Sequence, residues 1–137
     1  MPRGAQRVAG SCGSTRLYKG ASWSWTRSAA APSELPQATS NRQLASAFLF
    51  GYPLRSGHPT NPSDKILWVM RRPRDGSSLT VVGRPLGNAA PEVTVTEPPD
   101  STPGEIYPTI VDVPLPGCWQ FTLSWNGNHD TIELHYD

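Results

Sequence analysis

Charged residues and long apolar runs are both scarce in this sequence, and each scarcity excludes a class of protein. Charged residues make up 17% of the 137 residues, against about 25% in an average soluble domain. We therefore expect neither a charge-driven disordered chain nor a nucleic-acid partner, which would need a large basic field. The longest apolar runs, such as residues 66–70, have the length of a strand and fall far short of the about 20 residues that span a bilayer.

Motifs for catalysis, cofactors and metals are absent as well. The sequence has no nucleophile-elbow motif and no glycine-rich phosphate cradle, so we expect no catalytic, cofactor-binding or metal-binding residues and no cofactor. His129 and His135 lie six residues apart on one expected strand, about 20 Å, which is too far for both to share a metal with Cys118. The carboxylates of residues 97–105 match no calcium loop, and we interpret them as a solvated acidic loop.

Basic and acidic residues are divided unevenly along the chain. Residues 1–74 hold 11 of the 12 Lys and Arg residues, whereas residues 75–137 hold 9 of the 11 Asp and Glu residues. One interpretation is a basic arm that binds an anionic polymer. The alternative, which we favour because only Arg71, Arg72 and Arg74 cluster, places basic early strands beside acidic later ones.

Proline is abundant and divides the second part of the chain into short apolar segments. The sequence has 15 prolines, about twice the usual share of about 5%, and each interrupts a strand or a helix. Strands are expected at residues 44–50, 65–71, 79–82, 92–97, 106–113, 117–125 and 129–136. This pattern predicts an all-β domain at residues 44–137, an immunoglobulin-like two-sheet antiparallel sandwich of about seven strands, with an open barrel as the alternative. Residues 1–43 lack periodicity and predict a flexible N-terminal segment.

The last two expected strands predict a specific hairpin. Asn126 and Gly127 form a preferred two-residue turn, because both positions tolerate a positive φ. This turn places Phe121 opposite Ile132, and Trp119 opposite Leu134. Turn chemistry and the period-2 pattern therefore agree on one register.

Two segments resemble a known group of proteins. Residues 114–125, with the run Pro-Gly-Cys-Trp at 116–119, resemble the C-terminal strands of small bacterial secreted proteins and lipoproteins of unknown function. The run Lys-Ile-Leu-Trp-Val at 65–69 is similar to an earlier core strand of such proteins. The resemblance implies an extracytoplasmic immunoglobulin-like domain and brings no catalytic residues with it.

The two cysteines, Cys12 and Cys118, leave the compartment open between three interpretations. Small residues at 9–11 resemble the end of a lipobox, so Cys12 is a candidate lipidation site and the only expected route to a membrane. Position 9 is Ala where Leu is usual, and no apolar core precedes it, so the motif is either chance or the remnant of a longer leader. A Cys12–Cys118 disulfide would instead require an oxidising compartment, and two free thiols would indicate a cytoplasmic protein that starts at Met1.

Tryptophan is enriched, with 5 in the chain, and the residues divide into two groups. Trp68 and Trp119 lie on strand faces that we expect in the core. Trp23, Trp25 and Trp125 are candidate ligand contacts, because exposed aromatic rings can stack on sugars or anchor a partner. Trp23 and Trp25 could instead pack on the domain.

These observations favour a non-enzymatic, envelope-associated binding or interaction domain, with an unknown protein or glycan at the cell surface as its partner. The first alternative is a carbohydrate-binding module that uses the exposed tryptophans. The second is a hydrolase or metal enzyme with a site built from loops near His58 or residues 97–105.

Overall fold

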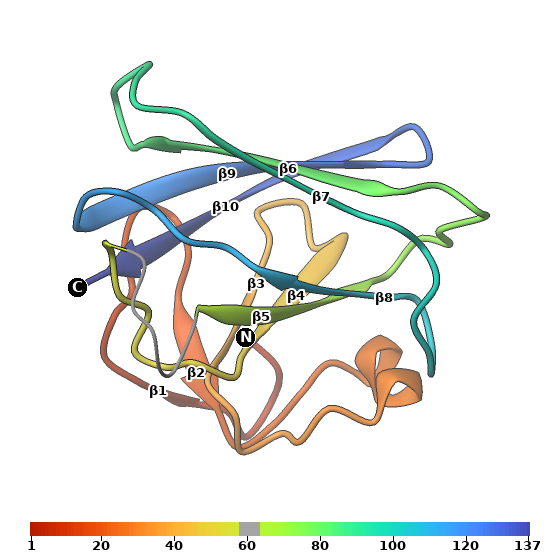
Figure 1. Ribbon diagram of the computed structural model, residues 1–137. Helices are drawn as coiled ribbons and strands as arrows, with labels where there is room; N and C mark the ends of the chain where they lie inside the picture. The colour runs from red at the N-terminus through yellow and green to blue at the C-terminus, as the bar shows by residue number, and fades with distance from the viewer. Residues whose placement is uncertain (58–63) are drawn as a thin grey trace.

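The computed structural model describes residues 1–57 and 64–137 as two antiparallel sheets that face one another. Figure 1 shows β6, β7, β9 and β10 in one layer above the layer that contains β3, β4, β5 and β8. The sheet orders are β1-β2-β3-β4-β5-β8 and β10-β9-β6-β7. The ten strands of the described residues are β1 (Gln6–Arg7), β2 (Leu17–Lys19), β3 (Gln37–Thr39), β4 (Ala45–Leu49), β5 (Lys65–Met70), β6 (Leu79–Pro85), β7 (Val93–Glu97), β8 (Ile106–Ile110), β9 (Gly117–Trp125) and β10 (Asn128–Tyr136).

The two facing sheets confirm the predicted all-β sandwich, and a strand occupies each of the seven expected positions. The immunoglobulin-like assignment stays a prediction. The core lies between the layers, where the inward faces of β5 and β9 contribute the fully buried indoles of Trp68 and Trp119. Each indole N–H is satisfied, by Thr109 Oγ1 at 2.9 Å and by the Leu115 carbonyl at 2.9 Å, as burial of an indole requires.

The predicted hairpin of β9 and β10 is confirmed in its register. Phe121 pairs with Ile132, and Trp119 pairs with Leu134. Asn126 has a φ of 45°, which a hairpin turn of this length requires.

Residues 1–43 differ from the expected flexible segment, because they form part of the sandwich. They supply β1, β2 and β3 of the six-stranded sheet, and Leu17 belongs to the main core cluster. The 3-10 helix η1 (Ser24–Ala29) packs outside this sheet, where Ala29 joins a second apolar cluster with Phe48, Val69 and Ile106. Burial of apolar side chains on both faces of the six-stranded sheet therefore holds residues 1–43 in place. Within the two described ranges, no helix is long and apolar enough to cross a membrane.

Candidate functional site

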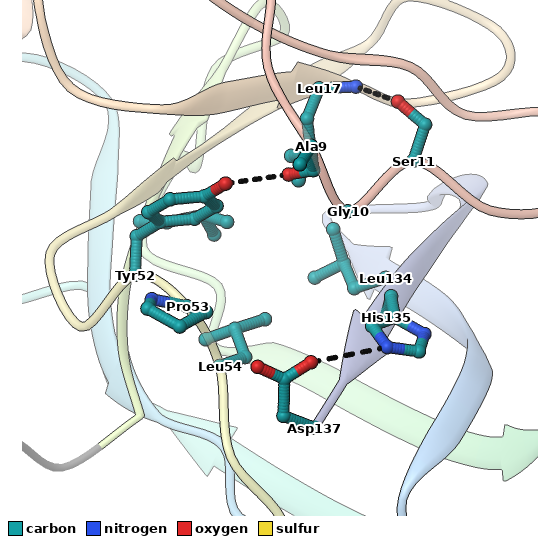
Figure 2. Close-up of a pocket in the computed structure, with 11 residues that line it drawn as sticks. Ala9, Gly10, Ser11, Leu17, Tyr52, Pro53, Leu54, Leu134, His135 and Asp137 are labelled. Atoms are coloured by element: carbon teal, nitrogen blue, oxygen red, sulfur yellow. Dashed lines mark hydrogen bonds and ion pairs between the residues drawn. The ribbon is translucent and has the colours of Figure 1, made fainter.

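A cleft of about 470 Å³ opens at one end of β10. Three segments that are distant in sequence form its walls: residues 9–11, residues 52–54, and the end of the chain at Leu134, His135 and Asp137. Figure 2 shows Tyr52, Pro53 and Leu54 on one side and Leu134 and His135 on the other. The site therefore depends on the tertiary fold and not on a local motif.

Main-chain hydrogen bonds fix two of these walls to each other. The Asp137 N–H donates to the Leu54 carbonyl at 2.9 Å, and the Ser56 N–H donates to the Asp137 carbonyl at 2.8 Å. The Tyr52 hydroxyl donates to the Ala9 carbonyl at 2.7 Å, which ties the third wall to the second (Figure 2). The cleft is thus held open by bonds that exist before any ligand arrives, which lowers the entropic cost of binding.

Gly10 shapes the third wall through its backbone. Its φ of +109° is rare for residues with a side chain, and a Cβ there would lie 2.9 Å from Leu17 Cδ1. Glycine permits both the turn and this close approach. Ser11 follows, and its hydroxyl accepts a hydrogen bond from the Leu17 N–H at 2.9 Å, so this serine serves the local fold.

The chemistry of the cleft combines an apolar floor with a polar rim. Leu54 and Leu134 are buried and the Tyr52 ring is half-buried, so they form an apolar surface. At the rim, His135 Nε2 lies 3.3 Å from Asp137 Oδ1, and both side chains are partly exposed. An apolar floor with a few convergent polar groups is typical of a small-molecule site.

The turn at residues 12–15 anchors the wall that carries Ala9, Gly10 and Ser11. Cys12 forms a disulfide with Cys118 of β9, with 5.9 Å between the two Cα atoms. The carboxylate of Glu133 accepts hydrogen bonds from the Ser14 N–H at 2.9 Å and from the Ser14 hydroxyl. The Thr15 hydroxyl accepts from the Glu133 N–H at 2.9 Å. One covalent bond and three hydrogen bonds therefore hold the turn on the outer face of β9 and β10.

Glu133 makes this anchor sensitive to acid. Burial raises the pKa of Glu133, but hydrogen bonds from Ser14, Asn41 and Gln120 outweigh burial and leave the pKa below the ordinary value of 4.5. Because the folded-state pKa is lowered, the carboxylate stabilises the fold above the ordinary value, and this stability is lost as pH falls through the lowered pKa.

We therefore expect Glu133→Gln to lower the free energy of unfolding by about 1–3 kcal/mol at neutral pH, because one amide cannot accept all these donors. The loss should shrink as the pH is lowered toward the acidic range in which the wild-type carboxylate is protonated. Urea titrations from pH 3 to pH 7 measure both effects. Glu34→Gln, which changes an exposed glutamate, should leave the pH dependence unaltered, and an equal loss for Glu133→Gln at every pH would contradict the role of its charge.

The candidate lipidation at Cys12 is not what the structure shows. The Cys12 sulfur is bonded to Cys118, and lipidation and this disulfide exclude each other. The disulfide was the alternative that the sequence left open. The disulfide forms because Cys118 lies on the outer face of β9, where the 12–15 turn docks. In the β9–β10 ladder Cys118 lies opposite His135, as the predicted register requires.

The three tryptophans proposed as ligand contacts do not form an exposed platform. Trp125 is 2% exposed, and its indole N–H donates to the Arg72 carbonyl at 3.2 Å. The expectation of exposure was wrong, because Trp125 shares the inward face of β9 with Trp119. Trp23 is half-buried and donates to Thr39 Oγ1 at 2.8 Å, and Trp25 is half-buried beneath the Arg71 guanidinium, 5.8 Å from the ring centre.

The other candidate residues stay apart. His129 contacts the Ser124 hydroxyl at 3.1 Å at the opposite end of β10 from the cleft, and His58 lies outside the described residues. Arg74 belongs to the basic cluster but lies 3.5 Å from Glu105, so it is neutralised by an acidic residue from later in the chain. In residues 1–57 and 64–137, no group of three or more His, Cys, Asp or Glu side chains could hold a metal ion.

Sequence reasoning missed the main residues of the cleft, which are Tyr52, Leu54 and Asp137. The strands expected at residues 44–50 and 65–71 leave a long loop between them that begins at Gly51, but nothing in its sequence pattern shows which segment it contacts. The one signal in the sequence for this site was Tyr52, an aromatic residue inside a loop rich in proline and glycine. In comparisons with known proteins, no family model, no curated protein and no solved structure matches this chain.

Proposed function

We propose that this chain is a non-enzymatic binding domain of an extracytoplasmic compartment and that it takes a small amphipathic ligand in the cleft beside β10. The observation that carries the proposal is the cleft itself, whose three walls are joined by hydrogen bonds and backed by a disulfide. Of the two hydroxyl groups that line the cleft, that of Ser11 accepts from the Leu17 N–H and that of Tyr52 donates to the Ala9 carbonyl. The cleft therefore supports recognition better than catalysis.

The disulfide supports the compartment. Disulfides persist in oxidising environments such as the bacterial periplasm and the cell exterior, and they are rare where thiols are kept reduced. The resemblance of residues 114–125 to small bacterial secreted proteins supports the same location. A partner protein or glycan at the cell surface remains part of this proposal.

A carbohydrate is the second candidate ligand, and a specific observation favours it. The Tyr52 ring and the Asp137 carboxylate line the same cleft, and sugars are bound by aromatic faces together with groups that accept hydroxyl hydrogen bonds. In this second proposal the sugar would stack on Tyr52 and not on the tryptophans.

Ligand binding can be tested by NMR titration of the ¹⁵N-labelled protein. The probes are cellobiose and N-acetylglucosamine as neutral sugars, tyramine as an aromatic amine, and benzoate as an aromatic anion. We expect at least one probe to cause saturable shifts confined to residues 9–11, 52–54 and 134–137. Saturation by a sugar would select the carbohydrate candidate. A Kd of about 1 mM corresponds to a binding free energy of only about −4 kcal/mol, so the absence of shifts with all four probes at about 1 mM would contradict the cleft as a binding site.

His135→Ala should weaken binding of the probe by about tenfold, because it removes one polar contact from the rim. His129→Ala is the matched control, since both histidines lie on the outer face of β10 but only His135 lines the cleft. Equal affinities for the two variants would exclude His135 from the site.

A further inference from the structure

One sheet edge, that of β7, lacks the protection that the other edges have. Unpaired strand edges attract other strands, and proteins cover, shorten or interrupt them. The β10 edge is covered, because the Asn41 N–H donates to the Thr131 carbonyl at 2.8 Å and Thr15 binds the Glu133 N–H. The β1 strand has two residues, and β8 contains Pro108. The β7 strand has five residues, Val93–Glu97, and no proline among them.

The register shows which groups of β7 point outward. The Leu86 N–H donates to the Cys118 carbonyl, so the even-numbered residues of β6 face β9 and its odd-numbered residues face β7. Val81 pairs with Val95 in that ladder. The backbone N–H and C=O groups of Thr94 and Thr96 therefore point away from β6, and within the described ranges β7 pairs with no other strand.

A groove beside this edge offers apolar contact. A space of about 500 Å³ lies between β7 and β8 and is lined by Val95, Pro108 and Ile110, among others. Ile110 is 53% exposed. Figure 1 places β7 in the upper layer and β8 in the lower one, joined by the segment that follows β7. A strand added to β7 would direct alternate side chains into this space.

The charge at the end of β7 indicates the partner. Glu97 lines the groove and Asp100 follows it; burial and then the Asp100 charge raise the pKa of Glu97. Lys65 also lines the groove, but its ammonium lies over the Phe50 ring, 5.1 Å from the ring centroid. Among the described residues, no basic side chain forms an ion pair with either carboxylate. An antiparallel second copy that paired Thr94 with Thr96 would bring Glu92 beside Pro98, a residue with no N–H to donate.

We propose that the β7 edge binds an extended, basic segment of a partner protein as a fifth strand of the four-stranded sheet, with alternate apolar side chains in the β7–β8 groove. This mode of recognition uses main-chain hydrogen bonds for affinity and alternate side chains for specificity. The surface lies at the opposite edge of the sheet from β10 and its cleft, so it is independent of the proposed ligand.

The test uses a capped hexapeptide of alternating Lys and Val, with a Glu–Val peptide of the same pattern as its comparison. We expect saturable NMR shifts at β7 and the groove with the Lys–Val peptide, slower amide exchange at Thr94 and Thr96, and weaker binding of the Glu–Val peptide. A Lys–Val peptide that is N-methylated at every residue should not bind, because neither of its edges can donate to β7.

Thr94→Pro should weaken the Lys–Val peptide by about tenfold, the value of one hydrogen bond at the edge. The substitution removes an N–H that makes no bond to β6, and proline is tolerated at such edge positions. Thr94→Val keeps the N–H and should bind as the wild type does. Glu97→Gln with Asp100→Asn should remove the preference for the basic peptide.

Three results would overturn the proposal. The first is the absence of saturable binding by the Lys–Val peptide. The second is equal binding of the N-methylated peptide, which is decisive even if Thr94→Pro fails to fold. The third is a concentration-dependent dimer in sedimentation that Thr94→Pro abolishes, because that would assign the edge to a second copy of this chain.

Discussion

Replacing Cys12 and Cys118 together with serine should lower the free energy of unfolding by about 4 kcal/mol, the largest loss that we expect from any single contact. The two cysteines are 106 residues apart in sequence, and a crosslink of that length removes much of the freedom of the unfolded chain. Urea denaturation of the double variant and of the wild type, both at neutral pH, measures the loss.

Reduction of the wild-type protein with dithiothreitol provides the control, because it breaks the same bond without changing the sequence. The reduced protein and the double serine variant should unfold at the same urea concentration. A loss of less than about 1 kcal/mol in both would show that hydrogen bonds alone hold the 12–15 turn, and a loss in the serine variant alone would assign the effect to packing.

Asp130→Ala should lower the free energy of unfolding by about 3 kcal/mol, because it leaves several buried donors without an acceptor. The Asp130 carboxylate is 3% exposed. It accepts from the Ser40 hydroxyl at 2.5 Å, from the Arg42 N–H at 2.8 Å and from the Leu44 N–H at 3.1 Å. One side chain at the start of β10 therefore closes the turn between β3 and β4.

Asp130→Asn is the matched variant, because it keeps the shape and one acceptor oxygen while it removes the charge. We expect a smaller loss for Asp130→Asn, and thermal unfolding of the two variants in the same buffer compares them. Ser40→Ala completes a double-variant cycle, in which non-additive losses measure the coupling of Ser40 to Asp130. Additive losses would contradict a direct contribution from this bond.

The predictable part of the fold is the part that local chemistry determines. Asn126 and Gly127 can adopt the positive φ angles of a tight turn, so the turn and the alternation of β9 and β10 lead to one register. Apolar residues occupy both faces of the strand β5, as is typical of a central strand, and it lies between β4 and β8. In each case the signal and its cause lie within a few residues.

Residues 1–43 could not be predicted in the same way. Their strands are two or three residues long, which is too short for an alternating pattern to appear. Their order comes from partners far along the chain, such as Glu133 for Ser14 and Cys118 for Cys12. The cleft has the same origin, because its walls meet only after the sheets have formed.

The burial of Trp125 was predictable from its place on the strand, although the residue also lies beside the turn at Asn126 and Gly127. Trp125 shares the face of Phe121 and Leu123 by the period-2 rule, and all three are buried. The segment that covers it, at Arg72 and Pro73, contacts both Trp125 and Asn126. The strand face on which Trp125 lies therefore predicts its burial better than its distance from the turn does.

The anchoring of the 12–15 turn on β9 and β10 also determines when the cleft can form during synthesis of the chain. A growing chain makes residues 9–15 long before their partners, Cys118 and Glu133, because 106 residues separate Cys12 from Cys118. Contacts of such long range form slowly, because a large loop must close before they stabilise anything. The cleft therefore cannot form before the growing chain has reached Asp137, and its formation requires that residues 9–15 have docked on β9 and β10.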